Sequence, residues 1–200
     1  MRYILFCLIF PSFINAQTAL IAGNDTVCDN ELAKLIIYFS GGSPPYTFVH
    51  AVNGVDRDPI TTNSLSYTLN TKDSGFYTLT SFSDDNGGGI ISGSGLVTHL
   101  ISPKAYFTAS PDSTNILNTK TQLTDNSISY NNIIVNSYWE FGDGNTFSYV
   151  SPNWKDTLSY KYPNEQGIYQ IRLIIQDDQG CTDTAQNLIV ISDFYSIFIP

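Results

Sequence analysis

The chain of 200 residues has few of the side chains that most often carry out catalysis or bind metal ions. It holds two histidines, three cysteines and one methionine, and only 14% of its residues are charged. Its sequence lacks a nucleophile elbow, a phosphate-binding loop, a dinucleotide fingerprint and a His-Glu-x-x-His segment. His50 and His99 both fall in strand-like segments, where we expect them to be structural. The sequence therefore predicts a protein that is not an enzyme and needs no metal or cofactor.

Cations are also scarce, since 9 Lys and Arg stand against 18 Asp and Glu. Nucleic acids and anionic lipid surfaces are bound through clustered positive charge, so this balance disfavours both as partners. Excess negative charge favours solubility, which suits a protein that works outside the cell. Solubility explains the acidity more readily than an acidic binding surface does.

The chain also lacks an apolar run of the roughly 20 residues that a membrane span needs, so we expect no membrane span. The N-terminus instead has the order of a secretory signal peptide: Arg2, an apolar run over residues 3–10, and the small Ala16 before Gln17. We expect cleavage between Ala16 and Gln17. Loss of Arg2 leaves 8 of the 9 Lys and Arg against 18 Asp and Glu, a net charge of −10. The expected location is extracellular, either secreted or at the cell surface.

No segment keeps apolar residues at helical spacing over three turns. The 13 tyrosines and 12 phenylalanines stand among Ser, Thr, Asn and Gly, which is a strand-and-turn composition. One strand pattern occurs twice, opened by Gly75-Phe76-Tyr77 and by Gly167-Ile168-Tyr169, and each copy ends in an Asp-Asp turn before a last strand. Tyr77 and Tyr169 stand where the tyrosine corner of an immunoglobulin-like sandwich would be. The predicted fold is all-β, with two tandem immunoglobulin-like β-sandwiches.

About 184 residues follow the predicted cleavage point, which suits two sandwiches of ~100 residues each. We place the boundary at Pro103, because proline cannot continue a strand ladder. Within the first sandwich, Asn53-Gly54 predicts a hairpin turn. The predicted domains are a signal peptide over residues 1–16, an immunoglobulin-like module over 17–102, a second sandwich over 103–192 and a C-terminal tail over 193–200.

The most informative stretch of the chain is an aromatic strand that runs into a Gly-Asp-Gly turn. Trp139 and Phe141 are two residues apart and so point to one face of the strand, which we expect to be the core. Gly142 and Gly144 permit positive φ on either side of Asp143, whose carboxylate can accept backbone N–H groups of its own turn. We therefore expect these five residues to be a structural motif of a surface β-module.

The same stretch resembles the W-D-F-G-D-G signature of PKD (polycystic kidney disease) domains, with Glu140 in place of the usual Asp. Downstream, an aromatic strand end is followed by Gly167 and Tyr169, which resemble the second signature of the family, a Gly-x-Tyr that opens a long strand. The two signatures occur in the order of the family. This resemblance assigns residues 103–192 to a PKD domain and gives Gly167 and Tyr169 a structural role.

Two further segments are similar to parts of surface adhesins of gliding bacteria. Residues 40–47, Ser-Gly-Gly-Ser-Pro-Pro-Tyr-Thr, resemble an element of their immunoglobulin-like repeats. Residues 194–200 resemble the start of the sorting domain of proteins exported by the type IX secretion system. The resemblance implies a non-catalytic module for adhesion or display in gliding motility, with an extracellular protein or polysaccharide as its partner.

Two other functions fit the same sequence. PKD modules also occur beside the catalytic domains of secreted hydrolases as accessory binding regions, and the reading frame after Pro200 separates this alternative from a surface module. A glycan-binding module would need a row of exposed aromatic side chains, for which Tyr149, Trp154 and Tyr160 are candidates.

The cysteines and the acidic turns both have structural explanations. Cys28 and Cys181 are the cysteines of the mature chain, and we expect both to be free thiols, because sandwiches joined end to end seldom bring two Cα atoms within ~7 Å. Export favours oxidation, which supports the alternative, a bridge between them. Asp84-Asp85 and Asp177-Asp178 lie in turns, where we expect their carboxylates to cap the backbone and not to bind calcium.

Overall fold

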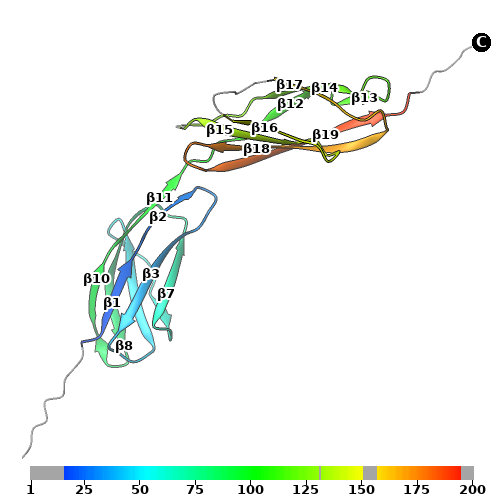
Figure 1. Ribbon diagram of the computed structural model, residues 1–200. Helices are drawn as coiled ribbons and strands as arrows, with labels where there is room; N and C mark the ends of the chain where they lie inside the picture. Colours follow the sequence, from blue (N-terminus) through cyan, green and yellow to red (C-terminus); the bar gives the residue numbers. More distant parts are fainter. Residues whose placement is uncertain (1–15, 131, 151–156, 195–200) are drawn as a thin grey trace, which may run out of the picture. The chain divides into compact units, whose positions relative to one another are not determined.

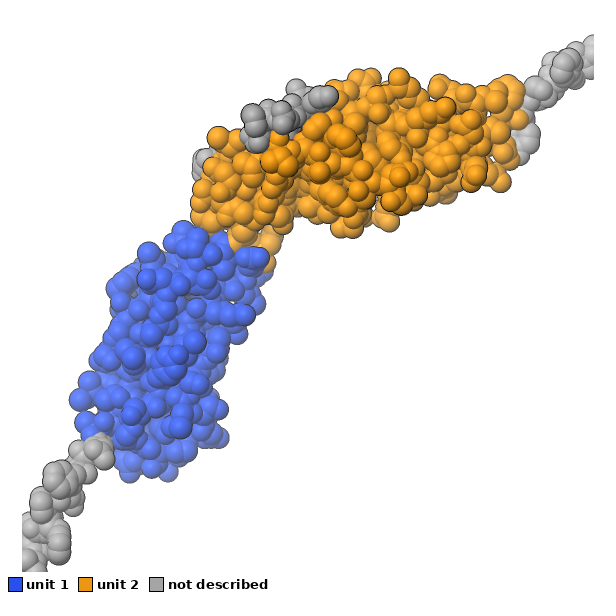
Figure 2. All heavy atoms as spheres, viewed as in Figure 1, with its two compact units in different colours: residues 1–27, 31–99 blue, residues 28–30, 100–200 orange. Residues whose placement is uncertain are grey.

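The structure is a computed structural model that describes residues 16–130, 132–150 and 157–194. These residues form strands β1 to β19 (Figure 1) and include no helix that could cross a membrane. They divide into two compact units (Figure 2): unit 1 takes the chain up to Val27 and from Glu31 to His99, and unit 2 takes Cys28–Asn30 and the chain from Leu100. The predicted signal peptide before Ala16 and the tail from residue 195 lie outside the described residues.

Unit 1 is a sandwich of two sheets. Its four-stranded sheet has the order β10-β1-β3-β7, and its seven-stranded sheet has the order β2-β11-β8-β4-β5, with β6 paired to β4 and β9 to β8. The strands of the first sheet are β1 (Thr18–Ala22), β3 (Ala33–Ser40), β7 (Ser66–Thr71) and β10 (Ile90–Gly93). Those of the second are β2 (Asn24–Cys28), β4 (Tyr46–Val52), β5 (Val55–Asp56), β6 (Ile60–Thr62), β8 (Gly75–Asp84), β9 (Gly87–Gly88) and β11 (Gly95–Leu100).

The turn between β4 and β5 confirms the predicted hairpin. Val52 pairs with Val55, so Asn53 and Gly54 form a two-residue loop, and their φ angles are 52° and 80°. A type I′ turn requires positive φ at both central positions, and Asn and Gly tolerate it best. The local sequence therefore fixes the register of this hairpin.

The core of unit 1 follows from strict alternation along its strands. Burial along β3 alternates residue by residue, with Leu35, Ile37 and Phe39 inside. Tyr77 on β8 is fully buried, and its hydroxyl donates to the carbonyl oxygen of Asp73 at 2.7 Å. A tyrosine that reaches back to the backbone a few residues upstream is a tyrosine corner, as predicted for this position.

Unit 2 is the second sandwich. Its three-stranded sheet has the order β12-β14-β17 and its five-stranded sheet the order β13-β19-β18-β15-β16. The first sheet contains β12 (Phe107–Ser110), β14 (Lys120–Asp125) and β17 (Thr157–Lys161), and the second contains β13 (Ser113–Asn115), β15 (Ile134–Glu140), β16 (Thr146–Val150), β18 (Gly167–Asp177) and β19 (Thr182–Ser192). The long antiparallel pair β18–β19 runs in register from Gly167 opposite Ile191 to Gln176 opposite Thr182. The chain thus forms two β-sandwiches, and the predicted fold class is confirmed.

Period-2 alternation also positions the two faces of the five-stranded sheet. Ile171, Leu173 and Ile175 on β18 are fully buried, and Trp139 on β15 lies directly opposite Leu173. The ring of Phe107 from the other sheet meets the Trp139 ring edge-on at 5.1 Å between centroids. Residues between these buried positions must therefore point away from the core.

Candidate functional site

The Trp-Glu-Phe-Gly-Asp-Gly stretch forms the end of β15 and the turn that follows it. Trp139 and Phe141 are 1% and 2% exposed, so both side chains belong to the core. Gly142 and Gly144 have φ angles of 83° and 91°. A Cβ on Gly142 would lie 2.6 Å from the backbone oxygen of Gln170, so neither the conformation nor the space at this position accepts a side chain.

Asp143 is the centre of a hydrogen-bond network in that turn. Its Oδ1 accepts the backbone N–H of Asn145 at 3.0 Å, and its Oδ2 accepts the hydroxyl of Tyr160 at 2.7 Å and the side-chain amide of Asn145 at 3.1 Å. The Tyr160 ring stacks on Phe141 with centroids 3.7 Å apart. Asp143 therefore ties β17 to the turn after β15.

The two partners of this network titrate in opposite directions. Partial burial acts to raise the pKa of Asp143, but hydrogen bonds from Tyr160 and Asn145 to the ionised carboxylate outweigh it, and the pKa is lowered. Burial and the hydrogen bond to Asp143 raise the pKa of Tyr160 to about 12. Near neutral pH the pair is a carboxylate that accepts from a neutral phenol.

The second signature is also part of the packing. Tyr169 is half-buried, with its ring 4.7 Å from that of Tyr162 between centroids. A Cβ on Gly167 would lie 3.2 Å from the Tyr169 ring, so a larger residue there would require the ring to shift by a few tenths of an ångström. Tyr162 is buried, and this burial raises the pKa of its phenol.

The aromatic row expected for a glycan-binding module is not formed by the residues that were predicted. Tyr149 is 8% exposed because its position on β16 faces the core, opposite the buried Ser137. Tyr160 is bound to Asp143 and stacked on Phe141. Trp154 lies outside the described residues. The prediction of Tyr149 as an exposed aromatic was wrong, because the alternation of β16 points it inward.

An exposed surface of a different kind lies on the solvent side of the five-stranded sheet. We call it the outer face, and it consists of residues two apart on three neighbouring strands. They are Asn136, Tyr138 and Glu140 on β15, Gln170, Arg172, Ile174 and Gln176 on β18, and Thr184 and Gln186 on β19. Tyr138 is 38% exposed and lies directly opposite Ile174.

Side chains of the outer face bind one another across the strands. The side-chain amide of Asn136 donates to Gln176 Oε1 at 2.9 Å, and that of Gln170 donates to Gln186 Oε1 at 2.9 Å. Between these amide pairs, Arg172 Nη1 donates to Glu140 Oε2 at 2.8 Å. Since this one cation and one anion neutralise each other, the outer face has no net charge, although the whole chain has a net charge of −9.

The outer face ends in an apolar patch near the start of β18. Ile168 is 69% exposed and lies opposite Val190, and Leu188, 51% exposed, lies opposite Gln170. A shallow cavity of about 400 Å³ lies beside the patch, lined by Gln166, Gly167, Ile168, Val190 and Ile191. Amides, hydroxyls, a tyrosine ring and aliphatic groups on one flat, uncharged surface suit a partner that is itself uncharged and rich in hydrogen-bonding groups.

A comparison with protein-family models matches residues 102–191 to the PKD domain. This segment is a PKD domain. The match covers most of unit 2 and includes the aromatic strand, its turn, and every strand of the outer face. The predicted assignment of this half of the chain to the PKD family is therefore confirmed.

Curated relatives of the PKD domain include two proteases. A pre-pro-metalloprotease PrtV of Vibrio cholerae is 30% identical over 113 residues, which is 56% of this chain and 11% of the relative. A microbial collagenase of Vibrio alginolyticus is 36% identical over 69 residues, 34% of this chain and 8% of the relative. The chain thus spans about a tenth of the length of the curated relatives it matches.

Solved structures give two further similarities. The PKD1 domain of the Vibrio cholerae metalloprotease PrtV is 25% identical, with 46% of this chain and 99% of that chain covered and a TM-score of 0.37. The fibronectin(III)-like modules of Clostridium thermocellum CbhA are 15% identical, with 88% and 94% covered and a TM-score of 0.41.

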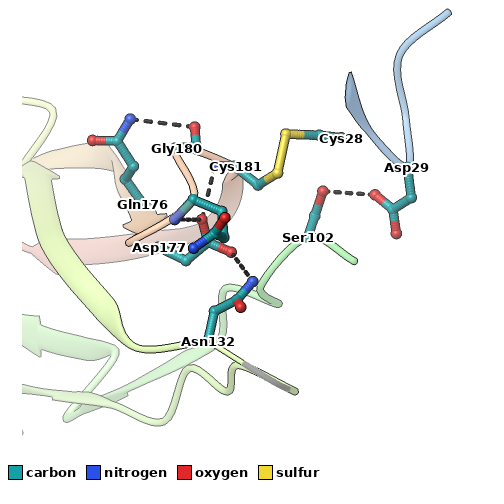
Figure 3. Close-up of a disulfide and its surroundings, with 9 residues drawn as sticks. Cys28, Asp29, Ser102, Asn132, Gln176, Asp177, Gly180 and Cys181 are labelled. Carbon is teal, nitrogen blue, oxygen red and sulfur yellow. Dashed lines mark hydrogen bonds between the residues drawn. A yellow bond between two sulfur atoms is a disulfide. The ribbon is translucent and has the colours of Figure 1, made fainter. Parts of the chain in front are cut away.

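The structure corrects the prediction for the cysteines. Cys28 and Cys181 form a disulfide (Figure 3), with their Cα atoms 5.7 Å apart. The expectation of free thiols assumed that residues before the first long strand stay with the first sandwich. Instead Cys28–Asn30 groups with unit 2, where Asp29 N–H donates to the Leu100 carbonyl at 2.9 Å and Ser102 Oγ donates to Asp29 Oδ1 at 2.6 Å. The premise about distance was wrong, and the export expected from the N-terminal sequence would favour the oxidised form.

The acidic turns bind their own backbone. Asp177 Oδ1 accepts N–H groups of Gln179 and Cys181 at 3.0 and 2.8 Å, and its Oδ2 accepts the side-chain amide of Asn132 at 2.9 Å. Asp84 in unit 1 likewise accepts the N–H of Asn86 in its own turn at 2.8 Å, and it also accepts the N–H of Ser43 at 2.7 Å. Across the described ranges, no group of three or more His, Cys, Asp or Glu side chains is placed to hold a metal ion.

A cavity of mixed polarity, of about 340 Å³, lies in unit 1, and its lining includes His50, Arg57, Asp73 and Tyr77. His50 is 7% exposed and stacks on Tyr77 with centroids 6.1 Å apart. Burial, and then the charge of Arg57, lower the pKa of His50, so the imidazole is neutral near pH 7. Arg57 Nη2 pairs with Asp73 Oδ2 at 2.7 Å, and Asp58 is the third charged residue of the lining.

Proposed function

We propose that this protein is a non-catalytic, exported module of a cell surface, and that its PKD domain binds an uncharged extracellular polysaccharide on the outer face. The observation that carries the proposal is the chemistry of that face. It presents amide groups and one tyrosine ring on a flat sheet, and its single ion pair, Glu140 with Arg172, leaves it without net charge. A strongly acidic chain that keeps one large face neutral favours a neutral partner.

The signal peptide expected over residues 1–16 supports export. The similarity of residues 40–47 and 194–200 to adhesins of gliding bacteria supports type IX secretion and a role in adhesion or display. A second candidate is an accessory binding region of a secreted hydrolase, which is favoured by the matches to a metalloprotease and a collagenase. A catalytic domain encoded in frame after Pro200 supports this second candidate, and a sorting segment supports the first.

A sedimentation assay with insoluble polysaccharides tests the binding site. The mature protein is mixed with microcrystalline cellulose, insoluble starch and cross-linked dextran as neutral probes, and with calcium alginate beads as the anionic probe. We expect binding to at least one neutral probe and none to alginate. Tyr138→Ala should weaken that binding at least about tenfold, the loss of a contact worth about 1.4 kcal/mol.

Tyr106→Ala is the matched control, because Tyr106 lies in the same unit, is 57% exposed and precedes β12 of the other sheet. It should bind as the unchanged protein does. Equal binding by the Tyr138 variant, or binding to alginate alone, would contradict the proposal. Melting curves of both variants show that the fold is retained.

A further inference from the structure

The disulfide divides the chain at different points from the boundary between the two sandwiches. Cys28 and Cys181 are 153 residues apart, and the bridge closes the chain between them into a loop. That loop contains strands β3 to β18. Of the described strands, only β1 and β2 before Cys28 and β19 after Cys181 lie outside it. The bridge therefore joins the two ends of the chain by a covalent path that omits most of both units.

The segments outside the loop are already extended. β1 runs over Thr18–Ala22 and β2 over Asn24–Cys28, with Gly23 alone between them. β19 begins at Thr182, the residue after Cys181, and continues without interruption to Ser192. A strand rises by about 3.3 Å per residue, close to the roughly 3.6 Å limit of a fully stretched chain. Each of these two segments therefore has little slack along its own length.

Both ends of the bridge are held in place by hydrogen bonds of backbone and side-chain groups. On one side Cys181 is fully buried, its N–H donates to Asp177 Oδ1, and its carbonyl accepts the Asp177 N–H at 2.9 Å. On the other side the neighbouring Asp29 is bound to Leu100 and Ser102. Figure 3 shows the hydrogen bond of Ser102 with Asp29 on one side of the two sulfur atoms and the hydrogen bonds of Asp177 on the other. Burial of Cys181 restricts access of reductants to the bridge.

We propose that the disulfide is a mechanical bypass: when the two ends of the mature chain are pulled apart, tension passes along β1, β2, the sulfur–sulfur bond and β19, and the residues of the loop are shielded from it. Loss of hydrogen bonds between β19 and β18 gives almost no added length, because β19 is already extended. The sandwiches therefore stay folded under loads that would unravel them in the reduced protein. This inference does not depend on the identity of the ligand.

Single-molecule force spectroscopy on the mature protein tests the bypass, with handles at Gln17 and Phe194. Without reductant, the distance between the two handles should stay below about 100 Å, the full length of the roughly 24 residues outside the loop plus the span of the bridge. With dithiothreitol in the same chamber, the accessible length should increase by about 550 Å, which is the 153-residue separation stretched at about 3.6 Å per residue. An oxidised molecule that extends to the reduced length would overturn the proposal.

Two controls make the result specific to the bridge. The Cys28→Ser, Cys181→Ser double variant should reach the long extension with and without reductant; a short limit in this variant contradicts the bypass. Handles at Asn63 and Leu117, which both lie inside the loop, should give the same maximal length in either redox state, because the direct chain between them is shorter than the path through the bridge. Non-reducing peptide mapping of the same sample checks the Cys28–Cys181 linkage independently of force.

Discussion

In both units a long strand begins with Gly-x-Tyr, but the two tyrosines make different contacts. Tyr77 in unit 1 is fully buried, and its hydroxyl fixes the backbone at Asp73. Tyr169 in unit 2 is half-buried, and its ring packs against that of Tyr162 in a tilted contact. In unit 2 a different tyrosine makes the corresponding hydrogen bond: the Tyr160 hydroxyl on β17 donates to Asp143 in the turn after β15. The repeated Gly-x-Tyr motif thus specifies where a strand begins. Which tyrosine hydroxyl stabilises the sandwich by a hydrogen bond depends on the acceptor that lies next to it in the fold.

The exposed sheet faces differ in the same way. Tyr38 on the four-stranded sheet of unit 1 is 47% exposed and lies opposite Leu20, which is 40% exposed, and Ser66. Tyr138 in unit 2 instead lies within the amide and ion-pair ladder of the outer face. Only the second tyrosine has hydrogen-bonding side chains arranged around it in cross-strand pairs. Tyr38→Ala in the sedimentation assay therefore compares two exposed tyrosines with different surroundings, and we expect it to leave binding unchanged.

The largest effect should come from the core of one unit. Trp139→Ala removes a side chain that is 1% exposed and should destabilise unit 2 by about 3–5 kcal/mol. A domain has a total stability of about 5–15 kcal/mol, so a large share of molecules would lose this unit. Phe48→Ala in the core of unit 1 is the counterpart. In scanning calorimetry each variant should lower a different transition; a shared shift in both would show that the units do not unfold separately.

A smaller effect should separate the two Gly-x-Tyr tyrosines. Tyr77→Phe leaves the Asp73 carbonyl and the Thr71 hydroxyl without their partner, a loss of about 1–3 kcal/mol. At 4–8 °C per kcal/mol the melting midpoint of unit 1 should fall by several degrees. Tyr169→Phe keeps the ring that packs on Tyr162 and should change stability by less than about 0.5 kcal/mol. Equal shifts in the melting midpoint for the two variants would show that the hydroxyl of Tyr77 contributes no more to stability than that of Tyr169.

Local sequence was enough for the features that depend on neighbouring residues. Positive φ at Asn53 and Gly54, and the inward direction of Trp139 and Phe141, follow from glycine chemistry and from alternation along one strand. The disulfide could not be predicted from local sequence, because the course of Cys28–Asn30 depends on tertiary contacts with unit 2.

The contacts on the outer face also could not be predicted from local sequence alone. Alternation predicts which side of a strand Gln170 occupies, but the hydrogen bond from Gln170 to Gln186 depends on the register between β18 and β19. That register depends on the hydrophobic pattern of both strands and on the turn between Asp177 and Thr182, so the alternation of β18 alone does not predict it.

The turn of the PKD domain should respond to acid. The folded-state pKa of Asp143 lies below its unfolded value of roughly 3.9, so its contribution to stability is complete above that pH and is lost as the pH falls through the folded pKa. Asp143→Asn should therefore flatten the decline in the melting midpoint of unit 2 below about pH 4 and leave unit 1 unchanged. Parallel acid curves for variant and unchanged protein would show that the hydrogen bonds to Asp143 contribute nothing measurable.

The smallest expected effect is that of calcium, which should be zero in both units. Asp84 in unit 1 and Asp177 in unit 2 direct their carboxylates at backbone N–H groups, which leaves no cluster of oxygens of the kind calcium requires. A cation that binds only the folded state at a hundredfold excess over Kd would add about 2.7 kcal/mol. For a ~90-residue sandwich this corresponds to a rise of roughly 10 °C or more. Calorimetry in millimolar calcium and then in chelator should give the same two transitions; a rise of that size in one transition alone would assign a calcium site to that unit and make its turn aspartates ligands.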